Sequence, residues 1–158
     1  MTITWQGGQN FTVKAKGMNI TLGEKNKLGD LEITEPGEYE VGGTEFDWSD
    51  GIIQVCTESM TIGHIKKAKI MTDEEMEKLN GIDILLIGVG GGEFAETKTA
   101  IGCISQIDPA IVIPMYKDSL EDFAKEEGGA TEPKDEFKAT KGELPIDGRQ
   151  VVVLNAGR

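Results

Sequence analysis

The sequence predicts an α/β protein whose helices lie on the outside of its sheet structure. The first third consists of short segments that alternate apolar and polar residues or carry β-branched residues, separated by glycine-containing turns. The second half changes to apolar strands that alternate with helical segments. Glycine is abundant, at 21 of 158 residues, whereas there are only 5 prolines, which indicates many tight turns. This order fits a two-sheet sandwich with outer helices as well as it fits a single open sheet.

The strands of the first 65 residues are predicted from their β-branched and alternating residues and from the turn residues between them. Lys16-Gly17 has the composition of a tight hairpin turn, and Glu58-Ser59 joins two further strands. Pro36-Gly37 is typical of a type II turn. The predicted strands are Thr2–Trp5, Asn10–Ala15, Met18–Leu22, Leu31–Thr34, Tyr39–Val41, Ile52–Thr57 and Met60–Ile65.

The second half is predicted to alternate strands and helices. Thr72 and Glu75 form a capping box that opens a helix to about Leu79. Ile82–Ile87 and Ala110–Pro114 are apolar runs, and we expect them to pair in parallel because a helix joins them. The remaining predicted elements are helices at about Ala95–Gln106 and from a Ser119 cap to Gly128-Gly129, a short strand Phe137–Thr140 and a closing strand Gln150–Leu154.

Length and charge limit the classes of partner. At 158 residues the chain suggests a single domain, residues 1–158, able to bury about 70% of its unfolded surface without disulfides. Its 16 basic and 28 acidic residues give a formal net charge of −12. Nucleic acids and anionic membrane surfaces both require a basic face, so neither is expected as a partner.

Cysteine use and the N-terminus favour a cytoplasmic protein. Cys56 and Cys103 lie in apolar runs, where reduced, buried thiols are expected. The first residues lack the basic segment and long apolar stretch of a signal peptide. The longest purely apolar runs, such as Ile84–Ile87, are far too short to span a membrane.

The glycine-rich segment Gly88–Gly92 lies between a predicted strand and a predicted helix, which is where phosphate-binding loops occur. Its spacing fits neither G-x-G-x-x-G nor a Walker A loop, because Glu93 stands where the former requires glycine. A carboxylate at that point would also repel a phosphate. We interpret the segment as a tight turn, with a nucleotide-binding module as the minor alternative.

Other reactive residues have ordinary structural interpretations. His64 is the only histidine, and a zinc site needs three or four nitrogen, sulfur or oxygen ligands. Cys103 is interpreted as a core thiol, because a nucleophilic role would require His64 as its base. Asp47 and Asp50 bracket Trp48, which predicts an acidic turn of the Asx type.

Several motifs between Ile3 and about Leu154 are informative together. They are ITW at the start of the chain, ITEPGEYEVG over Ile33–Gly42, the helix Thr72–Leu79, IDILLIGVGG over Ile82–Gly91 and IVIPM over Ile111–Met115. In this combination the chain resembles the metallo-β-lactamase superfamily, in the branch of predicted zinc-dependent hydrolases related to the ascorbate-6-phosphate lactonases. The resemblance implies a trimmed four-layer αββα sandwich, which agrees with the order of the predicted elements.

The metal ligands of that family are absent from this chain. The H-x-H-x-D-H motif belongs after the early strands, where only Gly23–Asp30 is found, without a histidine. Lys67 stands at the position of the aspartate in the family's H-L-G-D segment, and Tyr116 at the histidine of P-M-H-Y. An ammonium group at Lys67 would repel Zn²⁺. The resemblance thus implies the fold without its metal-activated water, and no cofactor is expected.

We therefore expect a non-catalytic, metal-free protein of the metallo-β-lactamase fold that serves binding or assembly. The alternative is a hydrolase with a non-standard site, built on Asp and Glu side chains or on metal-free chemistry of Lys67, Tyr116 and His64. The expected partner is another copy of the chain, another protein, or a small anion. Positions matching the family's metal-side loops give a candidate cleft of His64, Lys67, Gly90, Gly91 and Tyr116, where a lysine and a tyrosine facing glycine-loop amides suit an anion.

Overall fold

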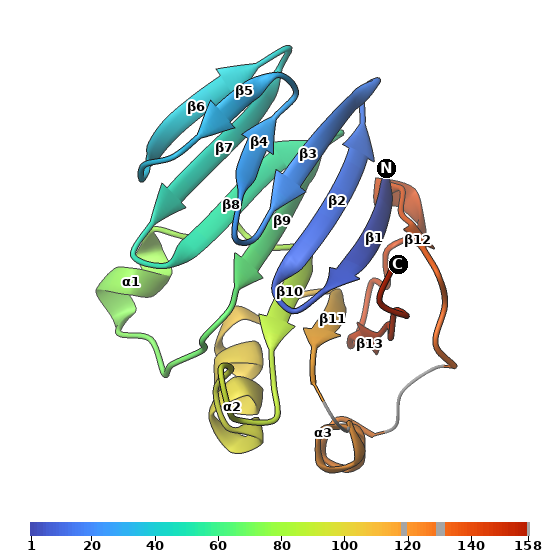
Figure 1. Ribbon diagram of the computed structural model, residues 1–158. Helices are drawn as coiled ribbons and strands as arrows, with labels where there is room; N and C mark the ends of the chain where they lie inside the picture. Colours follow the sequence, from blue (N-terminus) through green and yellow to red (C-terminus); the bar gives the residue numbers. More distant parts are fainter. Residues whose placement is uncertain (118–119, 129–131, 158) are drawn as a thin grey trace.

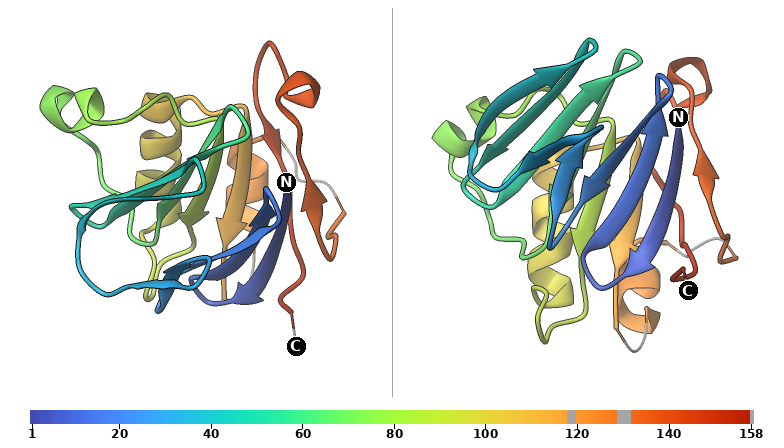
Figure 2. Two further views of the ribbon diagram at one scale, coloured as in Figure 1. Left: turned by 90° about the horizontal axis from the view of Figure 1, so that it is seen from above. Right: turned by 45° about the horizontal axis from the view of Figure 1, so that its top comes forward.

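Two β-sheets pack face to face in the computed structural model, which describes residues 1–117, 120–128 and 132–157 (Figure 1). The first sheet has the strand order β12-β1-β2-β3-β4-β5, and the second has the order β13-β11-β10-β9-β8-β7-β6. One apolar cluster fills the space between the sheets, and a second lies between the second sheet and its helices. Figure 2 shows this layering from above.

The first sheet is antiparallel throughout. Lys16 and Gly17 both have positive φ, 52° and 71°, which confirms the predicted tight turn between its second and third strands. A three-residue strand inside Gly23–Asp30 was not predicted. The strands are β1 (Thr2–Gly7), β2 (Asn10–Ala15), β3 (Met18–Leu22), β4 (Asn26–Leu28), β5 (Leu31–Ile33) and β12 (Phe137–Lys138).

The second sheet is mixed. Its strands are β6 (Gly37–Val41), β7 (Thr44–Ser49), β8 (Ile52–Thr57), β9 (Met60–Ile65), β10 (Ile84–Gly88), β11 (Ile111–Met115) and β13 (Gln150–Val151). Strand β10 lies parallel to both β9 and β11, with Ile84 paired to Ile62 and to Ile111. The predicted parallel pair of apolar strands is confirmed. The closing strand is shorter than predicted, although the Val152 amide still donates to the Val112 carbonyl at 2.9 Å.

The predicted acidic turn around Trp48 is wrong. Asp47 and Trp48 lie within β7, which pairs with β6 on one side and β8 on the other. Only Asp50, with φ of 52°, lies in the following turn. Burial of Thr44 and Phe46 on alternate positions holds the segment as a strand, so packing overrides the local turn preference of aspartate.

The segment around Pro36 is a crossing between sheets rather than a hairpin turn. Strand β5 is the edge of the first sheet and β6 the edge of the second. Gly37 already pairs with Trp48 as the first residue of β6. Three residues therefore carry the chain from one sheet to the other at the open side of the sandwich.

The helices are few and short. They are α1 (Asp73–Glu77), α2 (Thr97–Ile107), α3 (Glu121–Glu126) and the 3₁₀ turn η1 (Lys141–Glu143). The capping box predicted at Thr72 and Glu75 is confirmed. Helix α2 buries Ala100, Cys103 and Ile104 against the second sheet. No helix in the described ranges is long and apolar enough to cross a membrane. The predicted Ser119 cap and Gly129 lie outside the described residues.

Candidate functional site

The C-terminal ends of β9, β10 and β11 lie side by side at one edge of the second sheet (Figure 1). The register pairs Ile65 with Ile87 and Gly88 with Met115, so the segments that follow these strands leave the sheet as neighbours. The five predicted cleft residues lie at or just beyond these strand ends. They form one site only if they also face the same cavity.

His64 lies in the interior at this edge. It is 3% exposed, and its Nε2 lies 2.7 Å from the Gln9 carbonyl oxygen. A carbonyl can only accept a hydrogen bond, so Nε2 carries the proton and donates it. Burial lowers the pKa of His64 and so favours the neutral imidazole. The only histidine thus ties the second sheet to the β1–β2 loop.

An aromatic row extends from His64 into the space between the sheets. Phe11 meets the imidazole edge to face at a centroid distance of 6.0 Å. Trp5 stacks on Phe11 at 6.4 Å, and Tyr116 lies against Trp5 at 4.9 Å. Trp5 and Phe11 are buried, and the Trp5 indole donates to the Gly8 carbonyl at 2.9 Å. The row places His64 at one end and Tyr116 at the other, with two buried rings between them.

The glycine-rich loop after β10 closes on itself. The Gly91 amide donates to the Ala95 carbonyl at 2.9 Å, and the Phe94 amide donates to the Gly91 carbonyl at 3.1 Å. Helix α2 begins only at Thr97, well after the glycines. An amide that is bonded within the loop cannot hold a phosphate, so the geometry is that of a tight turn.

A cavity of about 440 Å³ opens beside His64, between the second sheet and the loops of the first. His64 and Lys67 both line it, whereas Gly90, Gly91 and Tyr116 do not. Among the further lining residues that sequence reasoning missed are Trp48, Lys66 and Lys69. The lysine-rich run from position 66 to 69 was the available signal for the last two.

Two of these lysines are paired with carboxylates. Lys69 lies 2.6 Å from Glu75, and this ion pair raises the pKa of Lys69. Lys66 lies 3.8 Å from Glu93, and both side chains are exposed. Within the part of the chain that the structure describes, Lys67 makes no ion pair. The cavity therefore carries one cationic group without a counter-charge.

The donor set at this edge does not fit a zinc ion. Over residues 1–117, 120–128 and 132–157, no three His, Cys, Asp or Glu side chains are grouped to hold a metal. The Nε2 of His64 is committed to Gln9, and an ammonium group shares its cavity. A structural or catalytic zinc site needs at least three well-placed protein ligands.

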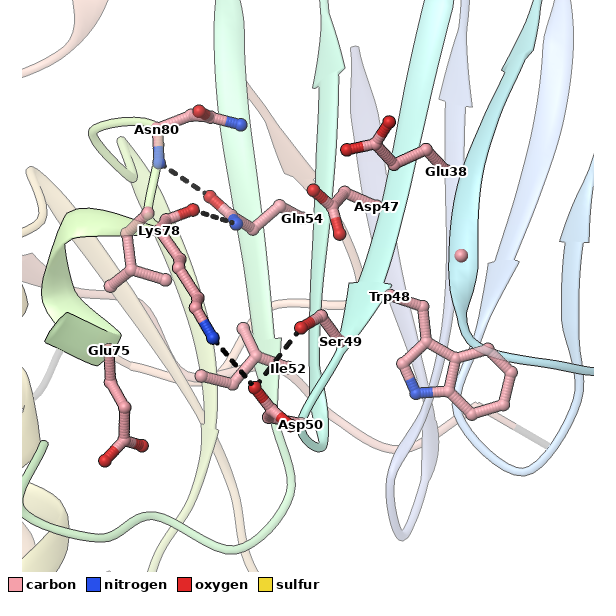
Figure 3. Close-up of a pocket in the computed structure, with 12 residues that line it drawn as sticks. Glu38, Asp47, Trp48, Ser49, Asp50, Ile52, Gln54, Glu75, Lys78 and Asn80 are labelled. Carbon is pink, nitrogen blue, oxygen red and sulfur yellow. Dashed lines mark hydrogen bonds and ion pairs between the residues drawn. The ribbon is translucent and has the colours of Figure 1, made fainter.

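A second hollow, also about 440 Å³, lies on the outer face of β6, β7 and β8 near α1 (Figure 3). Glu38 and Asp47 stand directly opposite each other there on neighbouring strands. Burial and the charge of Glu38 raise the pKa of Asp47. Gln54 spans the hollow, donating to the Lys78 carbonyl and accepting from the Asn80 amide. Like charges placed opposite each other destabilise a sheet, and the described structure offers these two no cation.

The two thiols should differ sharply in reactivity. Burial in α2 raises the pKa of Cys103 to about 11, whereas Cys56 is half-buried in β8. In native protein we expect a thiol reagent to modify Cys56 roughly 100-fold faster than Cys103, which reacts only after opening of the fold. Cys56→Ser should abolish the fast phase of thiol modification, whereas Cys103→Ser should leave that phase unchanged. Equal modification rates for the two thiols would contradict the burial of Cys103 in α2.

The sequence model of the beta-lactamase superfamily domain matches residues 4–116 of the chain. No curated protein matches the sequence significantly. Among solved structures, a proposed Zn-dependent hydrolase of the metallo-β-lactamase superfamily from Thermotoga maritima aligns with a TM-score of 0.83 at 23% identity, covering 98% of each chain.

Two further structures are similar. Igni18, a metallo hydrolase from the hyperthermophilic archaeon Ignicoccus hospitalis, aligns with a TM-score of 0.68 at 12% identity, covering 99% of this chain and 96% of its own. A proposed metal-dependent hydrolase from Parabacteroides distasonis aligns with a TM-score of 0.62 at 11% identity, covering 96% of this chain and 91% of its own. At these identities the likeness concerns the fold. Together with the two sheets and few helices, the matches confirm the trimmed αββα sandwich.

Proposed function

The chain belongs to the beta-lactamase superfamily, and on that premise we propose that it is a non-catalytic, metal-free member whose sandwich serves binding or assembly. The observation that carries this proposal is that no three His, Cys, Asp or Glu side chains are grouped to hold a metal among the described residues. The chain's only histidine, His64, is buried and bonded through Nε2 to the Gln9 carbonyl, so it stabilises the contact between the sheets. Its Nδ1 keeps a lone pair, but a zinc site needs at least three protein ligands.

The arrangement of Lys67, Tyr116 and His64 also argues against metal-free catalysis by these three side chains. A general base must reach the group that it deprotonates. His64 is buried in the interior, and Tyr116 lies beyond Phe11 and Trp5 at the far end of the aromatic row. These three side chains do not form a common catalytic arrangement.

The finer points of the proposal rest on sequence. The motifs over Ile33–Gly42 and Ile82–Gly91 favour the branch near the ascorbate-6-phosphate lactonases, and the reduced cysteines favour a cytoplasmic location. As partners we propose another copy of the chain, another protein or a small anion. A native mass measurement separates self-assembly from the other two.

Purified protein should contain less than about 0.1 equivalent of zinc, iron or manganese per chain, because the described residues offer no ligand set to hold one. The measurement is elemental analysis after purification without chelator. EDTA and added zinc should each leave the unfolding temperature unchanged, since a metal that binds only the folded state would shift it.

One equivalent or more of a transition metal would contradict the proposal. So would turnover of a phosphodiester, lactone or thioester substrate that is lost in the variant Lys67→Ala. The exposed Lys14, on the first sheet, provides the matched control, and Lys14→Ala should change none of these results.

A further inference from the structure

We propose that the cavity beside His64 binds a small organic anion whose charged head is held by Lys67 and whose apolar ring lies against Trp48. This inference rests on the proposed non-catalytic function and specifies the ligand of the same region. The volume, about 440 Å³, lies within the range of small-molecule sites.

The charge of the cavity is opposite to that of the protein. The chain has a formal net charge of −12, yet three lysines within four positions line this one cavity. Among the described residues of the wall, Asp50 has the only carboxylate, and it already lies 3.6 Å from Lys78. Local charge therefore favours an anion, and a lysine ammonium offers three donors to its oxygens.

Lys67 is the group best placed to hold the charged head. It has no ion pair among the described residues, so binding an anion breaks none. Lys66 can assist, because its pair with Glu93 is long and exposed and such pairs contribute little. Lys69 is held close to Glu75 and is the least available of the three.

The wall also has an apolar part, beside the polar Gln9, Asn26 and His64. Trp48 contributes a half-buried aromatic ring, and Ile53, Ile65 and Met71 are each no more than 5% exposed. Trp48 packs against the cluster between the sheets, on the opposite side of β7 from Asp47 (Figure 3). A bare inorganic anion would leave this surface in contact with water, whereas a ring would cover it. The wall therefore favours aromatic carboxylates and aromatic phosphate esters over inorganic phosphate.

The test is an NMR titration of ¹⁵N-labelled protein with benzoate and phenyl phosphate at up to about 10 mM, ten times the dissociation constant of a millimolar site. The chain has two tryptophans, so two indole signals report separately. We expect the Trp48 indole signal to shift. The Trp5 indole is bonded to Gly8 and should stay in place. Neutral benzamide and inorganic phosphate should each bind at least tenfold more weakly than the aromatic anions.

Variants locate the charged contact. Lys67→Ala should weaken binding about tenfold, the loss expected for one charge-assisted hydrogen bond, and Lys67→Arg should retain it. Lys14→Ala is the matched control, because Lys14 lies on the first sheet at the end of β2 remote from Gln9. No shift of the Trp48 signal, equal binding of benzamide, or equal binding of inorganic phosphate and phenyl phosphate would overturn the inference. Identical behaviour of the Lys67→Ala and Lys14→Ala variants would do the same.

Metal analysis of the same sample distinguishes the two proposals. Metal-free protein without anion binding overturns the ligand assignment and leaves the non-catalytic proposal standing. Protein that carries a stoichiometric metal overturns the non-catalytic proposal, whatever the titration shows.

Discussion

Leu86→Asp should leave the chain without a soluble folded state. Leu86 is completely buried in the cluster between the sheets and pairs with His64 on one side and Ile113 on the other. The variant loses about 1.5–3 kcal/mol of apolar burial and adds an unpaired carboxylate to the interior. A domain of this kind has about 5–15 kcal/mol of total stability, so the combined cost can remove all of it. Soluble yield and cooperativity of urea unfolding measure the effect.

Leu86→Met is the matched control. It keeps the volume and the apolar character of the side chain, so the loss should stay below about 1.5 kcal/mol. A soluble Leu86→Asp protein with a cooperative unfolding transition would show that β10 is not a central strand.

Gly88→Ala should destabilise the fold by about 3 kcal/mol or more. A methyl group at Gly88 would overlap the backbone carbonyl oxygen of Lys66 and come within 2.8 Å of Cγ of Phe94. Lys66 directly follows β9, which is paired with β10, so its backbone cannot withdraw without disturbing that pairing. Overpacking against side chains alone typically costs about 1–3 kcal/mol, and a fixed backbone atom raises the cost. The midpoint of chemical denaturation reports the change.

Gly142→Ala separates this steric cost from the general effect of replacing a glycine. A methyl group at Gly142 would meet no atom within 4 Å, and φ at Gly142 is outside the positive range. Its stability should change by no more than about 0.5 kcal/mol. If Gly88→Ala and Gly142→Ala unfold at the same denaturant concentration, the close contact between Gly88 and the Lys66 carbonyl is incorrect.

Local patterns predicted most of the strands and helices because their signals lie within a few residues. The Lys16-Gly17 turn, the Thr72 capping box and the parallel apolar strands each depend on neighbours in sequence or on one nearby helix. Strand β7 was missed because two aspartates favour a turn locally. Its strand geometry is instead stabilised by pairing on both sides and by the burial of Phe46.

The candidate site was likewise predicted only in part, because local patterns do not show which distant residues meet. Five positions could be assigned to one edge of a sheet, and the parallel register of β9, β10 and β11 places them there. Only His64 and Lys67 line the cavity, because the rings of Trp5 and Phe11 separate Tyr116 from it. Trp48 joins the cavity from a strand that is distant in sequence, so no local pattern could have shown it.

The sequence by itself determined the charge balance, the absence of the superfamily's histidine ligands and the order of the elements that build the sandwich. These depend on composition, residue identity and short-range periodicity, which are fully present in a linear chain. The tertiary structure alone decided that His64 faces Gln9, that an aromatic row fills the space beside it and that the lysines meet Trp48 around one cavity. Such contacts join residues tens of positions apart in sequence. They depend on strand register and side-chain packing, which are fixed only when the two sheets pack against each other.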